Sequence, residues 1–277
     1  MLDPFQLPFM QRAALEVALL APIAGLLGAQ IVLRHLAFFT HGVGTAAFPG
    51  LVVAGPAGIP PALAAFAVGG GFAALLERLG RRGGVAWDAA TALLLVAALA
   101  LGIVLASDVF ATGAGVDRLL FGSLLAIGGG EILVSAAALL AAVVAAAAFR
   151  RDWIVAGFDE LGHGSPRRRA RFADAVLLVV VAIAAIAAID AVGALLVSAI
   201  LVVPAATARL FARSIAGLEA AATAIALAEG LAGLVIAYYL DAPPGAVVAV
   251  LGGAIFAVAL AGREIGTRGA TARRVTA

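Results

Sequence analysis

The sequence predicts an all-α fold, a polytopic bundle of about nine helices that cross a membrane. Hydrophobic residues make up 64% of the 277 residues and charged residues only 12%, whereas soluble domains are about half apolar and a quarter charged. The mean hydropathy is correspondingly high, at +1.15. The apolar residues also gather into stretches of about 20, the length of an α-helix that crosses ~30 Å of hydrocarbon with its backbone groups bonded internally.

The first three spans are separated by short turns. Residues 11–33 form the first predicted span and residues 39–57 the second. The pair Pro60 and Pro61 closes the second span, because proline cannot continue a helix. The third span then covers residues 62–76.

The middle of the chain holds two further spans and one shorter apolar segment. Residues 89–106 are the fourth predicted span and residues 132–149 the fifth. Residues 119–130 lie between them and are apolar, but they are too short to cross a bilayer. We expect this segment to be re-entrant or interfacial.

The last four spans come from a long apolar stretch and two shorter ones. Residues 174–207 are almost continuously apolar and about twice as long as one crossing requires. Asp190 interrupts this stretch near its middle and divides it into spans six and seven. The eighth span is residues 217–239 and the ninth is residues 246–261, joined by a tight turn at residues 241–245, DAPPG.

The positions of the basic residues support this count and predict an orientation. All 18 basic residues are arginine, and cytoplasmic loops carry an excess of such residues. With the N-terminus outside and the C-terminus cytoplasmic, every arginine except Arg12 and Arg118 falls on the cytoplasmic side. Asp108, Asp117 and Asp241 fall on the outer side.

The chain is predicted to form a single transmembrane domain over residues 1–277. Its longest cytoplasmic connection is residues 150–172, the only loop that could hold a small amphipathic helix. Residues 263–277 form a short basic cytoplasmic tail, which we expect to lie against the anionic inner leaflet.

The composition excludes several kinds of chemistry. A Walker A loop needs lysine to reach the phosphates, and the sequence has none. The absence of cysteine excludes disulfides and thiolate sites, and neither a His-Glu-x-x-His nor a Gly-x-Ser-x-Gly motif is present. We therefore predict no catalytic residues and no enzyme activity. The net charge of +2 also gives no reason to expect nucleic-acid binding.

Ionisable side chains inside apolar spans are costly to bury and mark candidate functional positions. Glu16 lies in the first span, His41 in the second, Glu229 in the eighth, and Asp190 at the outer turn after the sixth. Imidazole and carboxylate groups bind divalent first-row cations, and Thr45 shares a helix face with His41. These five residues are the predicted metal pathway. Alternatively, Asp190 ends a helix at the water boundary and the others make packing contacts.

Six segments, taken together, carry a resemblance to a known family. They are FMQR at residues 9–12, VLRHLAF at 32–38, AFFTHGVGTAAFPG at 37–50, LFGSLLA at 120–126, VGALLVSAILVVPAATAR at 192–209 and YLDAPPG at 239–245. In order and spacing they resemble the permease subunits of ABC importers for zinc, manganese and iron. The likeness runs from about residue 9 to residue 262.

The resemblance implies a transport subunit in the bacterial inner (plasma) membrane. Such a permease translocates a divalent transition-metal ion, here zinc, manganese or iron, into the cytoplasm. The partners implied are a separate cytoplasmic ATPase that supplies the energy, an extracytoplasmic metal-binding protein, the surrounding membrane lipid and a second copy of the chain in a homodimer. No cofactor is expected to be bound by the chain itself.

Two segments of this chain are compared with functional segments of that family. The family's second helix usually carries aspartate and, four residues later, histidine, and these positions are His41 and Thr45 here, which leaves the metal open. The resemblance also implies an ATPase-coupling segment in the long cytoplasmic loop. It is placed at the residues similar to the family's Phe-Asp-x-x-x-Ala segment, which are Phe158, Asp159, Glu160 and Leu161.

Other readings of the same residues stay open. A secondary transporter or channel driven by an ion gradient would use Glu16, Glu229 and Asp190 as proton or cation relays. The segment after Phe158 would then be a solvated loop. A membrane scaffold without transport is a third possibility.

Overall fold

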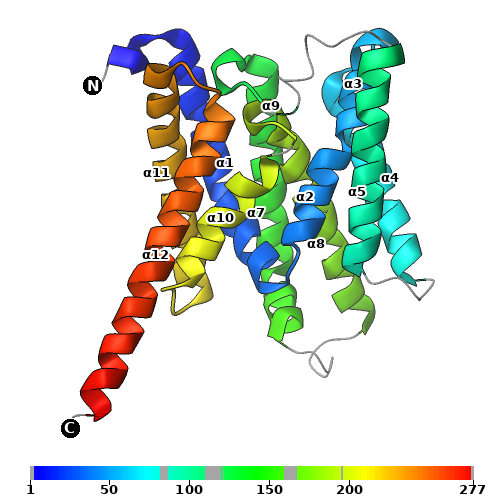
Figure 1. Ribbon diagram of the computed structural model, residues 1–277. Coiled ribbons are helices and arrows are strands. Elements are labelled where there is room, and N and C mark those ends of the chain that lie inside the picture. Colours follow the sequence, from blue (N-terminus) through cyan, green and yellow to red (C-terminus); the bar gives the residue numbers. More distant parts are fainter. Residues whose placement is uncertain are drawn as a thin grey trace.

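The computed structural model describes residues 3–81, 87–109, 120, 122–158, 167–194 and 196–275, and all regular structure within them is helical. Seven of these helices are long and apolar enough to cross a membrane, and the shorter apolar helices Pro61–Leu76 and Val197–Arg209 bring the described crossings to nine. Successive crossings alternate in direction, and the two termini lie at opposite ends of the bundle (Figure 1). The predicted all-α polytopic bundle is confirmed.

The first three crossings follow the predicted spans closely. The short 3₁₀-helix η1 (Asp3–Gln6) leads into α1 (Pro8–Leu33). The second crossing consists of two helices, α2 (Ala37–Ala46) and α3 (Phe48–Ala57), because Pro49 has no N–H to donate to the carbonyl of Thr45. The third crossing, α4, spans Pro61–Arg81.

The central part of the chain has two long helices and one long connection. Helix α5 (Trp87–Val104) ends in the π-helical turn η2 (Leu105–Val109). The short apolar segment that follows holds only the 3₁₀-helix η3 (Leu124–Ala126) among its described residues, in agreement with the prediction that it does not cross. Helices α7 (Gly129–Phe158) and α8 (Arg167–Ala187) come next.

The sixth crossing continues past α8 into the short helix α9 (Ile189–Val192), and the chain turns at Gly193, whose φ is 84°, close to the turn predicted at Asp190. The seventh crossing is α10 (Val197–Arg209). Helix α10 has 13 residues and is therefore about 20 Å long, less than the ~30 Å of the hydrocarbon core. Helices α11 (Ile215–Leu240) and α12 (Pro244–Val275) complete the bundle.

Three helices extend beyond their predicted ends. Helix α7 continues to Phe158 and α8 begins at Arg167, so both ends of the predicted loop at residues 150–172 are helical. Helix α12 continues to Val275, where a short tail was expected from residue 263. The polar composition of both regions resembled that of loops, yet alanine, arginine and glutamate are good helix formers in water.

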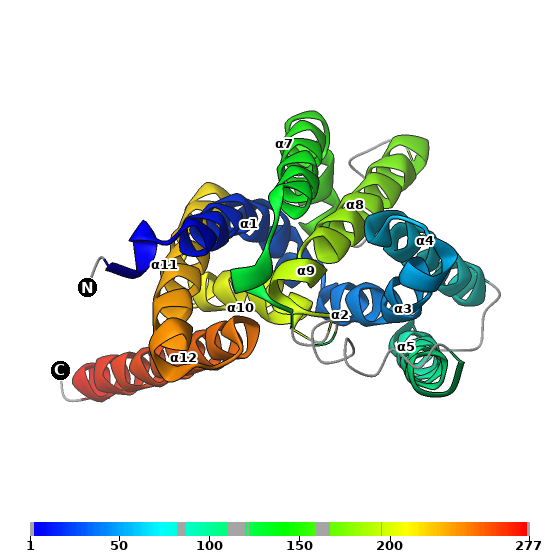
Figure 2. The same ribbon diagram turned by 90° about the horizontal axis from the view of Figure 1, so that it is seen from above.

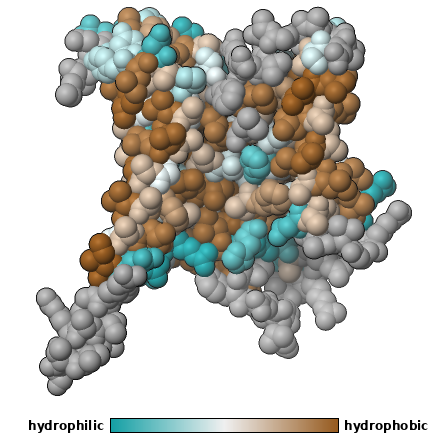
Figure 3. Space-filling view, viewed as in Figure 1, coloured by the Kyte–Doolittle hydropathy of each residue, from teal (hydrophilic) through white to brown (hydrophobic). Residues whose placement is uncertain are grey.

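Helix α1 lies at the centre of one half of the bundle, where it packs against α11, α10 and α7, while α2 packs against α5 and α8 (Figure 2). Helices α5, α7 and α12 lie at the periphery. Their exposed side chains include Leu93, Leu133 and Val250, and apolar residues form a belt above a more polar lower rim (Figure 3). Such a belt is what a bilayer would contact.

Candidate functional site

His41 and Thr45 lie on the face of α2 that contacts α10 and the turn before it. Nδ1 of His41 is 3.3 Å from the hydroxyl oxygen of Ser198 on α10. One turn further along α2, the hydroxyl of buried Thr45 donates to the carbonyl oxygen of Ala194, at 3.4 Å. Polar groups of α2, of α10 and of the turn before α10 thus meet inside the bundle, and the predicted helix-face pairing of His41 with Thr45 holds.

Glycine allows α2 to approach this crossing closely. A Cβ atom added at Gly44 would lie 3.3 Å from Cβ of Val197 and 3.5 Å from the carbonyl oxygen of Ala194. The first distance would require Val197 to shift by a few tenths of an ångström, and the second is an ordinary van der Waals contact. Small residues at helix contacts of membrane proteins permit such approach, and here they bring Thr45 within reach of a backbone carbonyl.

Glu16 occupies a different place, between α1 and α7. Its side chain is 1% exposed, and Oε1 accepts a hydrogen bond from the hydroxyl of buried Ser135 on α7. Oε2 is buried without a hydrogen-bond partner among the described residues. Asp190 and Glu131 lie close enough to interact electrostatically with Glu16. A small group of acidic side chains therefore surrounds one end of the contact between α1 and α7.

Asp190 lies in the short helix α9 and is partly exposed. Its carbonyl oxygen accepts the N–H of Ser123 at 3.1 Å. This hydrogen bond joins the segment before η3 to the end of the sixth crossing. The position near a helix end agrees with the turn that Asp190 was expected to mark.

Glu229 lies between α11 and α12. It is 2% exposed, and Oε2 is buried with no hydrogen-bond partner in the described part of the chain. A Cβ atom added at Gly252 of α12 would be 3.0 Å from that oxygen, so the carboxylate faces the glycine directly. A buried carboxylate oxygen without a partner is costly in an apolar environment.

The five predicted pathway residues are not brought into one site. His41 and Thr45 lie together with Ser198, Glu16 and Asp190 belong to a second group, and Glu229 lies between two other helices. Within the described residues, no three histidine, aspartate or glutamate side chains are grouped as metal ligands. Their common role in transport stays a prediction.

Sequence reasoning missed Ser198 and Ser135, the hydroxyl partners of His41 and Glu16. Both lie in long apolar stretches, where a single serine resembles any other small residue. Their separation along the chain is large, at 157 residues for Ser198 and His41 and 119 for Ser135 and Glu16. Only the packing of the helices brings these groups together.

The arginine-rich end of the bundle is held by ion pairs between helices. Arg34 donates to Asp174 at 2.5 Å and so joins α1 to α8. Arg150 of α7 donates to both carboxylate oxygens of Glu219 on α11, at 3.1 and 2.8 Å. Such two-point pairs fix the relative orientation of the planar groups.

Of the predicted ATPase-coupling segment, the structure describes only Phe158, the last residue of α7; Asp159, Glu160 and Leu161 lie outside the described residues. The flanking helices are joined before it, because Trp153 of α7 donates its indole N–H to a backbone carbonyl oxygen of α8 at 2.8 Å.

Comparisons with known proteins point in one direction. The model of the ABC 3 transport family matches residues 6–263. A probable iron transport system membrane protein of Haemophilus influenzae is 29% identical over 97% of this chain and 98% of its own. The manganese transport system membrane protein MntC of Halalkalibacterium halodurans is 27% identical over 91% of this chain and 86% of its own.

A solved structure shows the same fold. PsaBC from Streptococcus pneumoniae in complex with Fab superimposes with a TM-score of 0.83, at 24% identity, over 93% of both chains.

Proposed function

The chain belongs to the ABC 3 transport family, and from this premise we propose that it is the permease subunit of an ATP-binding-cassette importer that carries a divalent transition-metal ion into the cytoplasm. The match over residues 6–263 carries the proposal, together with relatives named for iron and manganese transport. Zinc is the third candidate ion. A chain without lysine has no Walker A loop, so the energy comes from a separate ATPase.

The metal path is proposed to begin at His41. The hydrogen bond with Ser198 occupies Nδ1 and leaves Nε2 for the ion, a common arrangement for histidine ligands. The hydroxyl of Thr45 adds an oxygen one turn away. Glu16, Asp190 and Glu229 are proposed as further polar positions along the path.

One histidine and one hydroxyl are a weak site for a transition metal, which prefers several nitrogen, sulfur or carboxylate ligands. A homodimer supplies two copies of His41. We therefore include a second copy of the chain in the proposal, with the two α2 helices contributing to one path. His41 and Thr45 stand where the family usually has aspartate and histidine, so this site lacks the aspartate carboxylate. It therefore favours an ion that binds well without a carboxylate ligand.

The proposed orientation places the N-terminus outside and the arginine-rich end in the cytoplasm of a bacterial cell, by the positive-inside rule. An extracytoplasmic metal-binding protein would then deliver the ion at the opposite end. Two copies of the ATPase would dock near Phe158, Asp159, Glu160 and Leu161. ATP-driven closure of the ATPases would move these segments and switch the bundle from outward to inward facing.

The test is uptake of zinc, manganese and iron into proteoliposomes that contain the permease, its ATPase and the binding protein. We expect His41→Ala to reduce uptake of the physiological ion at least about tenfold, the usual cost of losing a metal-binding contact. His35→Ala is the matched control, because His35 is exposed in the turn between α1 and α2. Unchanged uptake of all three ions by His41→Ala would remove His41 from the path.

The coupling segment has its own test. Phe158→Ala should weaken assembly with the ATPase or uncouple ATP hydrolysis from uptake. Assembly is measured by co-purification and coupling by the ATPase rate in the presence of the binding protein. Normal values of both would reject this position for the contact.

A secondary transporter is the alternative, and one observation favours it. Glu16 and Glu229 each have a buried carboxylate oxygen without a partner among the described residues, as proton or cation relays often do. Concentrative uptake by the purified chain alone, under a proton or sodium gradient in liposomes, would support this alternative and overturn the proposed dependence on an ATPase.

A further inference from the structure

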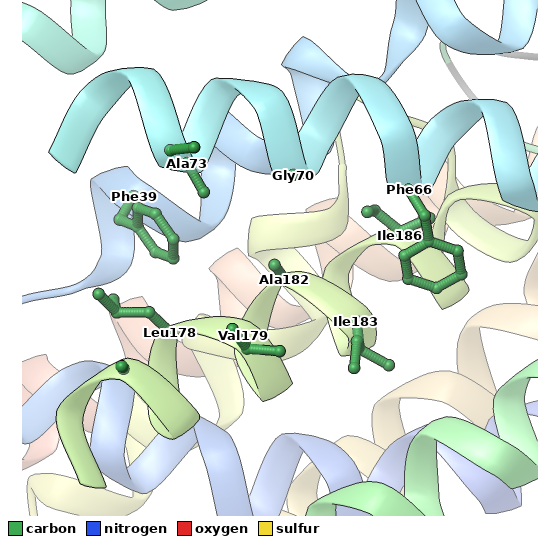
Figure 4. A pocket seen from close by; sticks show the side chains of 11 residues that line it. Phe39, Phe66, Gly70, Ala73, Leu178, Val179, Ala182, Ile183 and Ile186 are labelled. Carbon is green, nitrogen blue, oxygen red and sulfur yellow. The ribbon is translucent and has the colours of Figure 1, made fainter. Parts of the chain in front are cut away.

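An apolar groove runs between α4 and α8, away from the polar groups described above. It has a volume of about 370 Å³. Phe39 and Leu178 lie toward one end, Phe66 and Ile186 toward the other, and Gly70 lies in the α4 wall between them (Figure 4). Side chains at the mouth are exposed on the lipid-facing surface, such as Val179 at 58%.

The groove has the length of one leaflet. Its α8 wall reaches from Ala175 to Ile186, which at 1.5 Å per residue is roughly 16 Å. The hydrocarbon core of a bilayer is ~30 Å thick, so one leaflet contributes about half of this. An extended acyl chain that spans one leaflet matches this length.

Two arginines lie toward one end of the groove. Leu178 lines the groove and also a neighbouring cavity of about 220 Å³ that Arg34 and Asp174 line. Arg34 and Asp174 form an ion pair without net charge, and the guanidinium of Arg34 keeps further N–H donors for a second acceptor. Arg78 on α4, exposed at the same end of the bundle, adds a positive charge.

We propose that this groove binds an anionic glycerophospholipid from the leaflet at the arginine-rich end. One acyl chain lies between α4 and α8, and the phosphate lies at Arg34. Basic pockets between transmembrane helices at membrane surfaces recognise anionic head groups in this way. The bound lipid fills a gap on the lipid-facing side of α2, the helix that carries His41, and so supports its position.

Gly70 allows a direct test. A Cβ atom at this position meets no other atom within 4 Å, so Gly70→Leu fills the groove without a clash with the protein. Gly71→Leu is the matched control, because Gly71 has equally open surroundings but does not line the groove. Both changes replace a helical glycine with a better helix former, so neither should impair folding.

The measurement is native mass spectrometry of the purified full-length chain mixed with phosphatidylglycerol or phosphatidylcholine. We expect the wild type and Gly71→Leu to retain phosphatidylglycerol, and Gly70→Leu to retain at least tenfold less. Equal retention by Gly70→Leu and Gly71→Leu would overturn the proposal. Equal binding of the two lipids would overturn the role of Arg34. A change of oligomeric state in Gly70→Leu without loss of lipid would show that a second copy covers the groove.

A second measurement needs no variant. Phosphatidylglycerol with a photoactivatable group on its acyl chain should crosslink to peptides of α4 and α8 in the wild-type chain. Crosslinks distributed equally over the exposed faces of α5 and α12 would contradict a specific groove.

Discussion

The variant Ser198→Ala tests whether metal uptake depends on the orientation of the His41 imidazole, because the ring itself is retained. Ser198 Oγ lies 3.3 Å from Nδ1 of His41 and orients the ring. Loss of a group that orients a metal-binding histidine costs about 10 to 100-fold in metal affinity. Because 3.3 Å is longer than an optimal hydrogen bond, we expect the lower figure, about 10-fold or ~1.4 kcal/mol.

The assay is the concentration dependence of metal uptake in proteoliposomes that contain the complete importer. Ser198→Ala should raise KM about 10-fold with little change in the maximal rate. Ser198→Thr keeps the hydroxyl and should restore KM. Ser214→Ala, which removes the hydroxyl that caps α11, should leave KM unchanged. An unchanged KM in Ser198→Ala, or equal defects in the alanine and threonine variants, would refute the proposed orientation of His41.

Three further predictions concern helix contacts, with thermal unfolding in detergent as the measurement. Gly44→Leu should destabilise the chain by about 1 to 3 kcal/mol, because α10 leaves no room for a side chain there, and an unchanged melting temperature would contradict this contact. Trp153→Phe should cost about 1 kcal/mol by removing the indole hydrogen bond to the carbonyl of Ala173 in α8, and an unchanged melting temperature would contradict this contribution. Arg150→Ala and Glu219→Ala should couple by less than about 1 kcal/mol in a double-mutant cycle, since the arginine side chain is 40% exposed, and a coupling that resists high salt would contradict this.

The crossings were predictable from the sequence because each depends on local length and composition. A stretch such as residues 217–239 needs no partner to be recognised as long enough for the bilayer. The boundaries were less predictable where polar residues continue a helix. Helix α12 extends to Val275 through arginines and alanines that favour a helix but have the composition of a tail.

The exact place of the turn after the sixth crossing and the partner of His41 could not be predicted. The turn was expected at Asp190, but the helix continues to Val192 and the chain turns at Gly193, whose φ is 84°. Ser198 reaches His41 because α2 and α10 pack together across a separation of 157 residues. Local periodicity carries no information about such a contact.

The turn at Gly193, before α10, affects how this bundle can rearrange. Torsion about Gly193 is inexpensive because glycine lacks a Cβ atom, and no complete helical turn has to unwind when it changes. A rotation there would swing Ser198 away from His41 and redirect the partial positive charge at the start of α10. Rotation at Gly193 would thus link the binding of a cation at His41 to the tilt of the short helix α10.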